Sequence, residues 1–150
     1  MSSEMNVLKR NGSVETMSLD KITKRLINLG NETIKNVNYT QLAIKIMEGL
    51  YNNIQTSQID NLLSEQCISL VTTHLEYGEL ASRLVISNHQ KSTHDDYLKV
   101  VNELYNFKDV LGVKSSLINE KFYNIVVNNI DEIQKMFVYD RDYLLDYFGF

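Results

Sequence analysis

Apolar positions recur at helical spacing over most of this chain. Ile22, Leu26 and Leu29 are four and three positions apart, so they share one face of a helix predicted over residues 20–29. The Gly30-Asn31 pair that follows fits a helix end with a left-handed glycine just beyond it. Three more windows have the same spacing: residues 39–51, 56–74 and 76–91. The pattern therefore predicts four amphipathic helices that pack together before about residue 95.

The first residues predict a β-hairpin. Two short runs, Val7–Arg10 and Val14–Met17, flank Asn11-Gly12, the pair most typical of a two-residue type I′ turn. A hairpin of this size is not stable by itself, so we expect it to lie against the helices. The predicted fold class is mostly α (α+β), a four-helix bundle capped by a small β-hairpin sheet.

The helix predicted over residues 56–74 begins with capping residues. Thr56 or Ser57 can cap it, and Ser57 with Asp60 fits the S-x-x-D form of a capping box. A helix start of this kind carries backbone N–H groups without intrahelical partners. It can therefore receive an anion.

Beyond about residue 95 the pattern indicates the start of a second unit. One helix is predicted around Tyr97–Tyr105 and another over residues 117–130, with a loop at residues 109–116 between them. The last residues, Tyr147-Phe148-Gly149-Phe150, are aromatic, although chain ends are usually exposed. We therefore predict a first domain over residues 1–95 and the helical start of an incomplete second domain over residues 96–150.

Composition places the chain among soluble globular proteins. Hydrophobic residues make up 43% and charged residues 23% of its 150 residues, and no apolar run approaches the roughly 18 residues of a membrane span. The first residues lack the basic tip and apolar run of a signal peptide, so we expect a cytoplasmic protein with no membrane partner. The formal net charge of -4 disfavours nucleic acid as a partner, because such binding needs a basic surface.

Few residues suggest catalysis or metal binding. The single cysteine, Cys67, excludes an internal disulfide, a zinc site of several thiolates and dithiol redox chemistry within this chain. Its place on an apolar helix face predicts a buried, inert thiol. His74, His89 and His94 lack the spacing of ligands on one helix face, so no metal site and no catalytic residue is predicted.

The Lys9-Arg10 pair and Lys21 are candidates for anion binding. The pair lies at the predicted hairpin turn, and Lys21 lies in the first turn of a helix, where a cation opposes the helix dipole unless an anion is bound nearby. Lysine and arginine both suit phosphate oxygens. The simpler explanation of the pair is a solvated charged surface. Neither G-x-x-x-x-G-K-[ST] nor G-x-G-x-x-G is present, so the usual phosphate loops are missing.

Several segments share one resemblance. Val7–Glu15 and Leu19–Ile22 resemble the opening of an ATP-cone, the allosteric nucleotide-binding module at the N-terminus of many ribonucleotide reductase large subunits. Four later segments of the first domain continue the similarity: Gly49–Tyr51, Thr56–Asp60, Tyr77–Leu84 and Ser87–Lys91. Two segments near the end resemble the part of class I enzymes that leads into the catalytic barrel: Tyr139–Tyr143 and Asp146–Phe150.

The resemblance implies a site for ATP or dATP as an allosteric effector, bound with Mg2+. Lys9, Arg10 and Lys91 correspond to family positions that contact triphosphate oxygens. The other corresponding positions that line the nucleotide are Glu15, Lys21, Ile22, Thr56 and Asp60. The carboxylates among them are acceptors, suited to ribose hydroxyls or an adenine amino group and repelled by phosphate.

One detail of the hairpin does not fit this site directly. With a two-residue turn, Arg10 and Glu15 share one face of the hairpin and Lys9 points to the other. Either the register differs from that of the ideal turn, or the long Lys9 side chain reaches around the edge.

The resemblance also implies a regulatory function. In this family the cone responds to the ratio of ATP to dATP and changes the overall activity of ribonucleoside-diphosphate reductase in deoxyribonucleotide synthesis, usually through quaternary rearrangement. The implied partners are the remainder of the reductase large subunit, the radical-generating small subunit and further copies in a homo-oligomer. The family's chemistry needs a thiyl-forming cysteine and a reducing cysteine pair. With one cysteine, this chain is expected to be a part of the enzyme that cannot reduce a ribonucleotide alone.

Two other functions fit part of the pattern. A helical interaction module whose cone has lost nucleotide binding would share the predicted fold. Against it stand the retained residues Lys9, Arg10, Thr56, Asp60 and Lys91. A cone-bearing transcriptional repressor would carry a zinc ribbon and a basic DNA-binding surface, and this sequence has neither.

Overall fold

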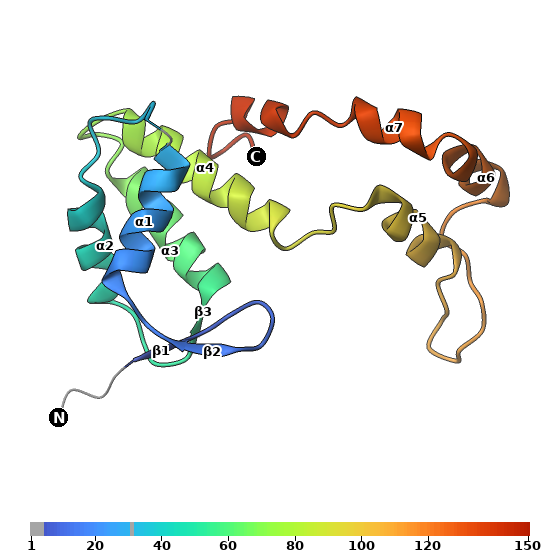
Figure 1. The fold of residues 1–150 in the computed structure, drawn as a ribbon, viewed down its shortest axis with the longest axis horizontal. Helices are drawn as coiled ribbons and strands as arrows, with labels where there is room; N and C mark the ends of the chain where they lie inside the picture. Colours follow the sequence, from blue (N-terminus) through green and yellow to red (C-terminus); the bar gives the residue numbers. More distant parts are fainter. Residues whose placement is uncertain (1–4, 31) are drawn as a thin grey trace. The chain divides into compact units, whose positions relative to one another are not determined.

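The computed structural model describes residues 5–30 and 32–150 and divides the chain into two compact units (Figure 1). The first contains the residues up to His89 together with Asp142–Phe150, and the second contains Gln90–Arg141. The last residues, which were expected to belong to the second domain, thus group with the first unit, and Tyr147 packs against its core. Helices and one small sheet make up the regular structure of the described residues, so the predicted fold class is confirmed.

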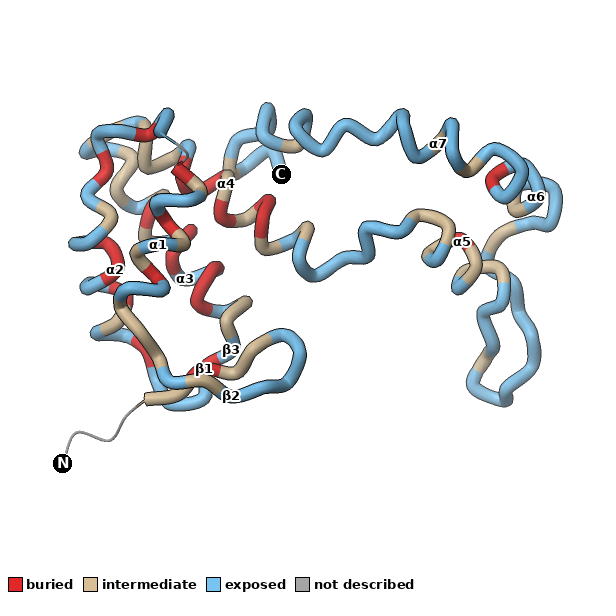
Figure 2. The backbone as a smooth tube through the Cα atoms, in the orientation of Figure 1, coloured by how far each residue is buried: buried red, intermediate tan, exposed pale blue. Residues whose placement is uncertain are grey.

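Four helices form the core of the first unit: α1 (Leu19–Gly30), α2 (Tyr39–Met47), α3 (Thr56–Ser69) and α4 (Glu76–Gln90). Their apolar faces meet in one cluster, in which Leu26, Leu80 and Leu84 are fully excluded from solvent. Most of the buried positions lie on these four helices (Figure 2). The four predicted helices are therefore confirmed, although α3 ends at Ser69 and not near His74.

A three-stranded sheet lies at one end of the first unit. Strand β1 (Asn6–Leu8) pairs antiparallel with β2 (Val14–Thr16) and parallel with β3 (Ile54–Gln55), in the order β2-β1-β3. The third strand extends the expected hairpin, and its two residues are too few to show any alternation in the sequence. Because β3 runs directly into α3, the sheet fixes the start of α3 beside the hairpin.

The loop of the hairpin differs from the predicted type I′ turn. The N–H of Gly12 donates to the carbonyl of Lys9, and the N–H of Lys9 donates to the carbonyl of Ser13. Gly12 has a φ of +82°, whereas Asn11 is not among the residues with positive φ. These features define a three-residue loop, a type I turn followed by a glycine bulge. The prediction of a two-residue turn was therefore wrong.

Gly30 does not end α1 in the predicted way. It is the last residue of α1 and is not among the residues with positive φ. A Cβ atom at position 30 would clash with the hydroxyl oxygen of Tyr39. That hydroxyl donates to the carbonyl of Ile34 at 2.6 Å. The close approach of Tyr39, rather than a left-handed helix end, explains the glycine.

The start of α3 is also capped differently from the prediction. Gln55, not Thr56 or Ser57, precedes the first helical residue, and its N–H donates to the side chain of Gln58 at 3.3 Å. Thr56 and Ser57 therefore belong to the first turn of α3. Asp60, expected to complete a capping box, is instead buried.

The second unit contains three α-helices among its described residues, α5 (Tyr97–Tyr105), α6 (Glu120–Asn128) and α7 (Ile130–Met136), and a 3-10 helix, η1, follows over Tyr139–Leu144. Tyr105 stacks on Tyr123 with ring centroids 4.0 Å apart, which joins α5 to α6. The buried residues of this unit are Val101 and Val126, so its core is small. Within residues 5–30 and 32–150, no helix is long and apolar enough to cross a membrane.

Candidate functional site

A small cavity lies between the hairpin loop and the start of α3. Its volume is about 200 Å³. It is lined by Leu8, Lys9, Arg10 and Gly12 from the loop side, and by Gln55, Thr56 and Ser57 from the junction of β3 and α3. The parallel pairing of β1 with β3 brings the two sides together, since it sets Leu8 beside Gln55.

The cavity suits an anion. The first turn of α3 supplies backbone N–H groups without intrahelical partners, together with the positive end of the helix dipole. The Thr56 hydroxyl lies at the same end, and Lys9 and Arg10 add two cationic side chains from the opposite wall. A helix start opposed by lysine and arginine is the combination that binds phosphate oxygens in many proteins.

Glu15 joins two of the predicted cations. Its carboxylate oxygens pair with Lys9, at 2.7 Å from Nζ to Oε2, and with Lys21. The observed register explains the first pair, because Val7 lies opposite Glu15 and Lys9 is two residues further along the same face. The departure from the ideal two-residue register thus resolves the conflict over the direction of Lys9.

Asp60 lies between two arginines, and its side chain is only 7% exposed. Arg25 of α1 donates from Nε to Oδ1 at 3.1 Å and from Nη2 to Oδ2 at 2.9 Å. Arg10 of the hairpin loop lies 3.5 Å from Oδ2. Both carboxylate oxygens of Asp60 therefore accept hydrogen bonds from Arg25. This leaves the carboxylate less available to accept from a ribose hydroxyl than the sequence analysis expected.

Asn88 of α4 links the hairpin loop to α3. Its side-chain oxygen accepts a hydrogen bond from Arg10. Its Nδ2 donates to the carbonyl of Ser57 at 3.2 Å and to Oδ1 of Asn61 at 2.6 Å. Asn88 therefore fixes the position of the Arg10 guanidinium relative to the first turn of α3.

The structure brings six of the eight predicted site residues into one connected group. Three of them line the cavity (Lys9, Arg10 and Thr56), and three pair with these or with one another (Glu15, Lys21 and Asp60). Ile22 is 8% exposed and belongs to the hydrophobic core instead. Lys91 follows the last residue of α4, is exposed and groups with the second unit.

Arg25 was missed by the sequence analysis. A buried aspartate requires a cation or several donors, so burial of Asp60 would have pointed to a partner. Which cationic side chain pairs with Asp60 depends on how α1 packs on α3. The spacing of apolar residues along the sequence does not give that packing.

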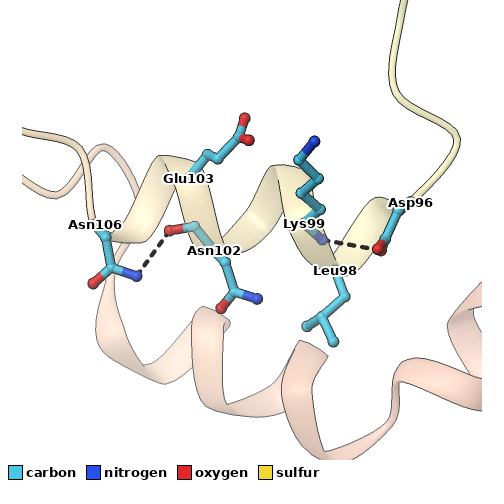
Figure 3. Close-up of a pocket in the computed structure, with 6 residues that line it drawn as sticks. All are labelled: Asp96, Leu98, Lys99, Asn102, Glu103 and Asn106. Carbon is cyan, nitrogen blue, oxygen red and sulfur yellow. Dashed lines mark hydrogen bonds between the residues drawn. The ribbon is translucent and has the colours of Figure 1, made fainter.

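A larger hollow along α5 has the character of an ordinary helix surface (Figure 3). It has a volume of about 570 Å³ and is lined by Asp96, Leu98, Lys99, Asn102, Glu103 and Asn106. The side chain of Asp96 caps the helix by accepting from the N–H of Lys99 at 3.0 Å. Asn106 donates to the carbonyl of Asn102 at 3.0 Å. These polar groups serve α5 itself, so we retain the cavity at the start of α3 as the candidate site.

Comparison with known proteins identifies the family of this chain. Residues 5–92 match the ATP cone domain, and this match covers more than half of the chain. The chain therefore belongs to the ATP cone family.

The similarity to particular proteins extends further. The chain is 36% identical over 148 residues to the ribonucleoside-diphosphate reductase large chain 2 of Saccharomyces cerevisiae, covering 97% of this chain and 17% of that protein. It is 36% identical over 146 residues to the large subunit of Plasmodium falciparum, covering 97% and 18%. It is 34% identical over 148 residues to that of Danio rerio, covering 97% and 19%. The chain is thus similar to the N-terminal region of these reductases and spans less than a fifth of their length.

Proposed function

We propose that this chain is the ATP- and dATP-sensing part of a ribonucleoside-diphosphate reductase large subunit. One observation carries the proposal: in a chain that belongs to the ATP cone family, Lys9 and Arg10 line the same cavity as Thr56 and Ser57 of the first turn of α3. Binding would be regulatory, and the reaction itself would take place in the remainder of the large subunit with a radical-generating small subunit. The relatives named as reductase large subunits support this assignment.

The proposed site holds the triphosphate between the loop and α3. Lys9, Arg10 and the Thr56 hydroxyl bind phosphate oxygens at the cavity. The resemblance adds Lys91 as a further phosphate-binding cation. Glu15, Lys21 and Asp60 complete the proposed set of residues around the nucleotide. Ile22, which the resemblance also assigns to the site, would support it from the core. Mg2+ enters with the phosphates, because this ion is usually held by substrate phosphates and waters with few protein ligands.

The regulatory response would come from coupling to assembly. ATP and dATP differ by one hydroxyl group, so local contacts alone distinguish them only modestly. Coupling of about 1–3 kcal/mol to subunit association is typical of allosteric proteins. We expect dATP to favour a larger, inhibited homo-oligomer of the complete enzyme and ATP to favour an active one.

Calorimetric titration of the purified chain with dATP and Mg2+ tests the proposal. We expect saturable binding at one site per chain. Lys9→Ala removes a charge-assisted contact of about 1.5–3 kcal/mol, so it should weaken binding about ten- to a hundredfold. Lys45→Ala, on α2 away from the cavity lining, is the matched control and should bind like the unmodified chain.

A helical interaction module with a degenerate cone is the second candidate. One observation favours it: Lys9, Lys21, Arg10 and Arg25 are each paired with Glu15 or Asp60, as they would be in a cone that binds nothing. Thermal denaturation separates the two functions. A nucleotide present at 100 times its Kd stabilises the folded state by about 2.7 kcal/mol, whereas a degenerate cone shows no shift of Tm.

A further inference from the structure

Arg25 is linked to the cavity through its ion pair with Asp60, which also pairs with Arg10. It does not line the cavity, whereas Arg10, which shares Asp60 with it, does. Only Arg25 makes a two-point contact, with distances of 3.1 and 2.9 Å, and Arg10 is further away at 3.5 Å. The geometry therefore separates Arg25, which Asp60 holds at two points, from Arg10, which lies further from Asp60 and is held by Asn88.

We propose that Arg25 is a positioning residue of the nucleotide site, which engages Asp60 so that Arg10 stays available to phosphate; this inference rests on the proposed function. Asp60 and the two arginines together carry one net positive charge beside the cavity. Without Arg25, the buried carboxylate would depend on Arg10 for its charge compensation. Arg10 and Asp60 would then form a neutral pair, with the guanidinium drawn away from the cavity.

Contacts on two further helices fix Arg25 in this role. Besides Asp60 on α3, its Nη2 donates to the buried Ser87 hydroxyl of α4 at 3.3 Å. The side chain of Arg25 thus joins α1, α3 and α4 at one point. Because the fold already fixes the guanidinium of Arg25, this group does not have to move before Arg10 binds an anion.

Titration with inorganic tripolyphosphate, and in parallel with dATP and Mg2+, tests the inference on the purified chain. Arg25→Gln should weaken the binding of both probes about tenfold, although residue 25 does not touch the cavity. Lys24→Gln makes the same change of charge one residue earlier at an exposed position of α1 and should leave both affinities unchanged. Equal binding by Arg25→Gln and the unmodified chain would overturn the inference and leave the proposed function intact.

A second variant separates positioning from a merely structural role. In Arg25→Gln/Asp60→Asn the net charge beside the cavity is again positive by one, and Arg10 has no carboxylate to satisfy. Asp60 is proposed to face the nucleoside and not the phosphates, so its loss does not remove a contact with tripolyphosphate. We expect the affinity of the double variant for this probe to return to within about threefold of the unmodified chain, even if Arg25→Gln alone unfolds. A double variant that binds as weakly as the single one, or that does not fold, overturns the inference. No binding of either probe by the unmodified chain would overturn the proposed function, and this inference with it.

Discussion

At the scale of single residues, the two carboxylates of the site differ in how firmly they hold their cations. Lys9 and Glu15 are each more than one-third exposed, and a pair of this kind contributes about 0–1 kcal/mol. A triphosphate can therefore replace Glu15 at little cost. The contact of Arg25 with Asp60 is two-pointed and mostly shielded from water, so it should persist. On nucleotide binding, Lys9 and Lys21 would then exchange Glu15 for phosphate oxygens, and Asp60 would stay paired with Arg25.

Cys67 should be unreactive as long as the chain is folded. Its side chain is fully buried, and burial raises the pKa of the thiol to about 12. Because the thiolate is the reactive form, an aromatic disulfide reagent should not label the native protein near neutral pH. In denaturant, one thiol per chain should react, which absorbance measures directly. Rapid labelling without denaturant would contradict the buried position.

Single residues also mark the limits of the sequence analysis. The basic pattern of the sequence already indicated Lys9 and Arg10, and the cavity brings them together with Thr56. The resemblance assigned all three to the site. It also supplied Ile22, whose side chain lies in the core, because a family position carries no information on how a side chain is oriented. Arg25 remained hidden, since its partner Asp60 is 35 residues away and only the packing of α1 on α3 makes the pair.

At the scale of elements, the helices were predictable and the loop was not. Four apolar faces at helical spacing predicted α1–α4 correctly. The Asn11-Gly12 pair, by contrast, is compatible both with a two-residue turn and with the three-residue loop that the structure has. The side chain of Asn11 accepts from the N–H and hydroxyl of Ser13, which supports the longer loop. That loop shifts the register, so Lys9 lies on the same face as Glu15. The three-residue loop, which the sequence analysis missed, is therefore the feature that brings Lys9 to Glu15 and so beside Lys21.

Gly12→Ala should destabilise the hairpin loop. No atom obstructs a Cβ at position 12, but φ is +82°, a conformation that costs an alanine about 1–2 kcal/mol. We expect the free energy of unfolding, measured in urea, to fall by about 1–2 kcal/mol. Gly49→Ala, at a glycine without positive φ, is the control and should be close to neutral. A Gly12→Ala variant as stable as the parent would contradict the glycine bulge.

Glu76 should make the stability of the first unit depend on pH. Its carboxylate accepts from the N–H of Asn36 at 2.6 Å and of Lys35 at 2.7 Å, which holds the connection between α1 and α2 against the start of α4. These bonds, the one from Asn36 first, lower the pKa of Glu76 below its usual value of 4.5. Since the pKa is lower in the folded state, the stabilisation is complete above about pH 4.5 and is lost as the pH falls through the folded value.

Thermal denaturation at a series of pH values measures this effect. Glu76→Gln should lower Tm at neutral pH, and the difference from the unmodified chain should shrink on acidification. The exposed Glu65→Gln on α3 is the control. A difference in Tm that stays constant from neutral to acidic pH would show that Glu76 acts only through packing.

At the scale of the whole molecule, the two units differ in how much of their apolar surface they cover. The first has a continuous core, whereas the second leaves Val110, Leu111 and Met136 exposed. Exposed apolar side chains in such numbers mark surfaces that meet other protein. The reductases that the chain resembles are more than five times as long, since it covers 17–19% of them. The remainder of a large subunit is therefore the partner we expect to cover these side chains.

The chain by itself should not reduce a ribonucleotide. The reaction implied by the resemblance to ribonucleotide reductases requires a thiyl-forming cysteine and a reducing pair. This chain offers only Cys67, buried in the core with a raised pKa. Mixed with a ribonucleoside diphosphate, a dithiol and a radical-generating small subunit, it should yield no deoxynucleotide by chromatography. The yeast large chain in the same mixture is the positive control. Product that requires the 150-residue chain and disappears in Cys67→Ser would contradict a purely regulatory role.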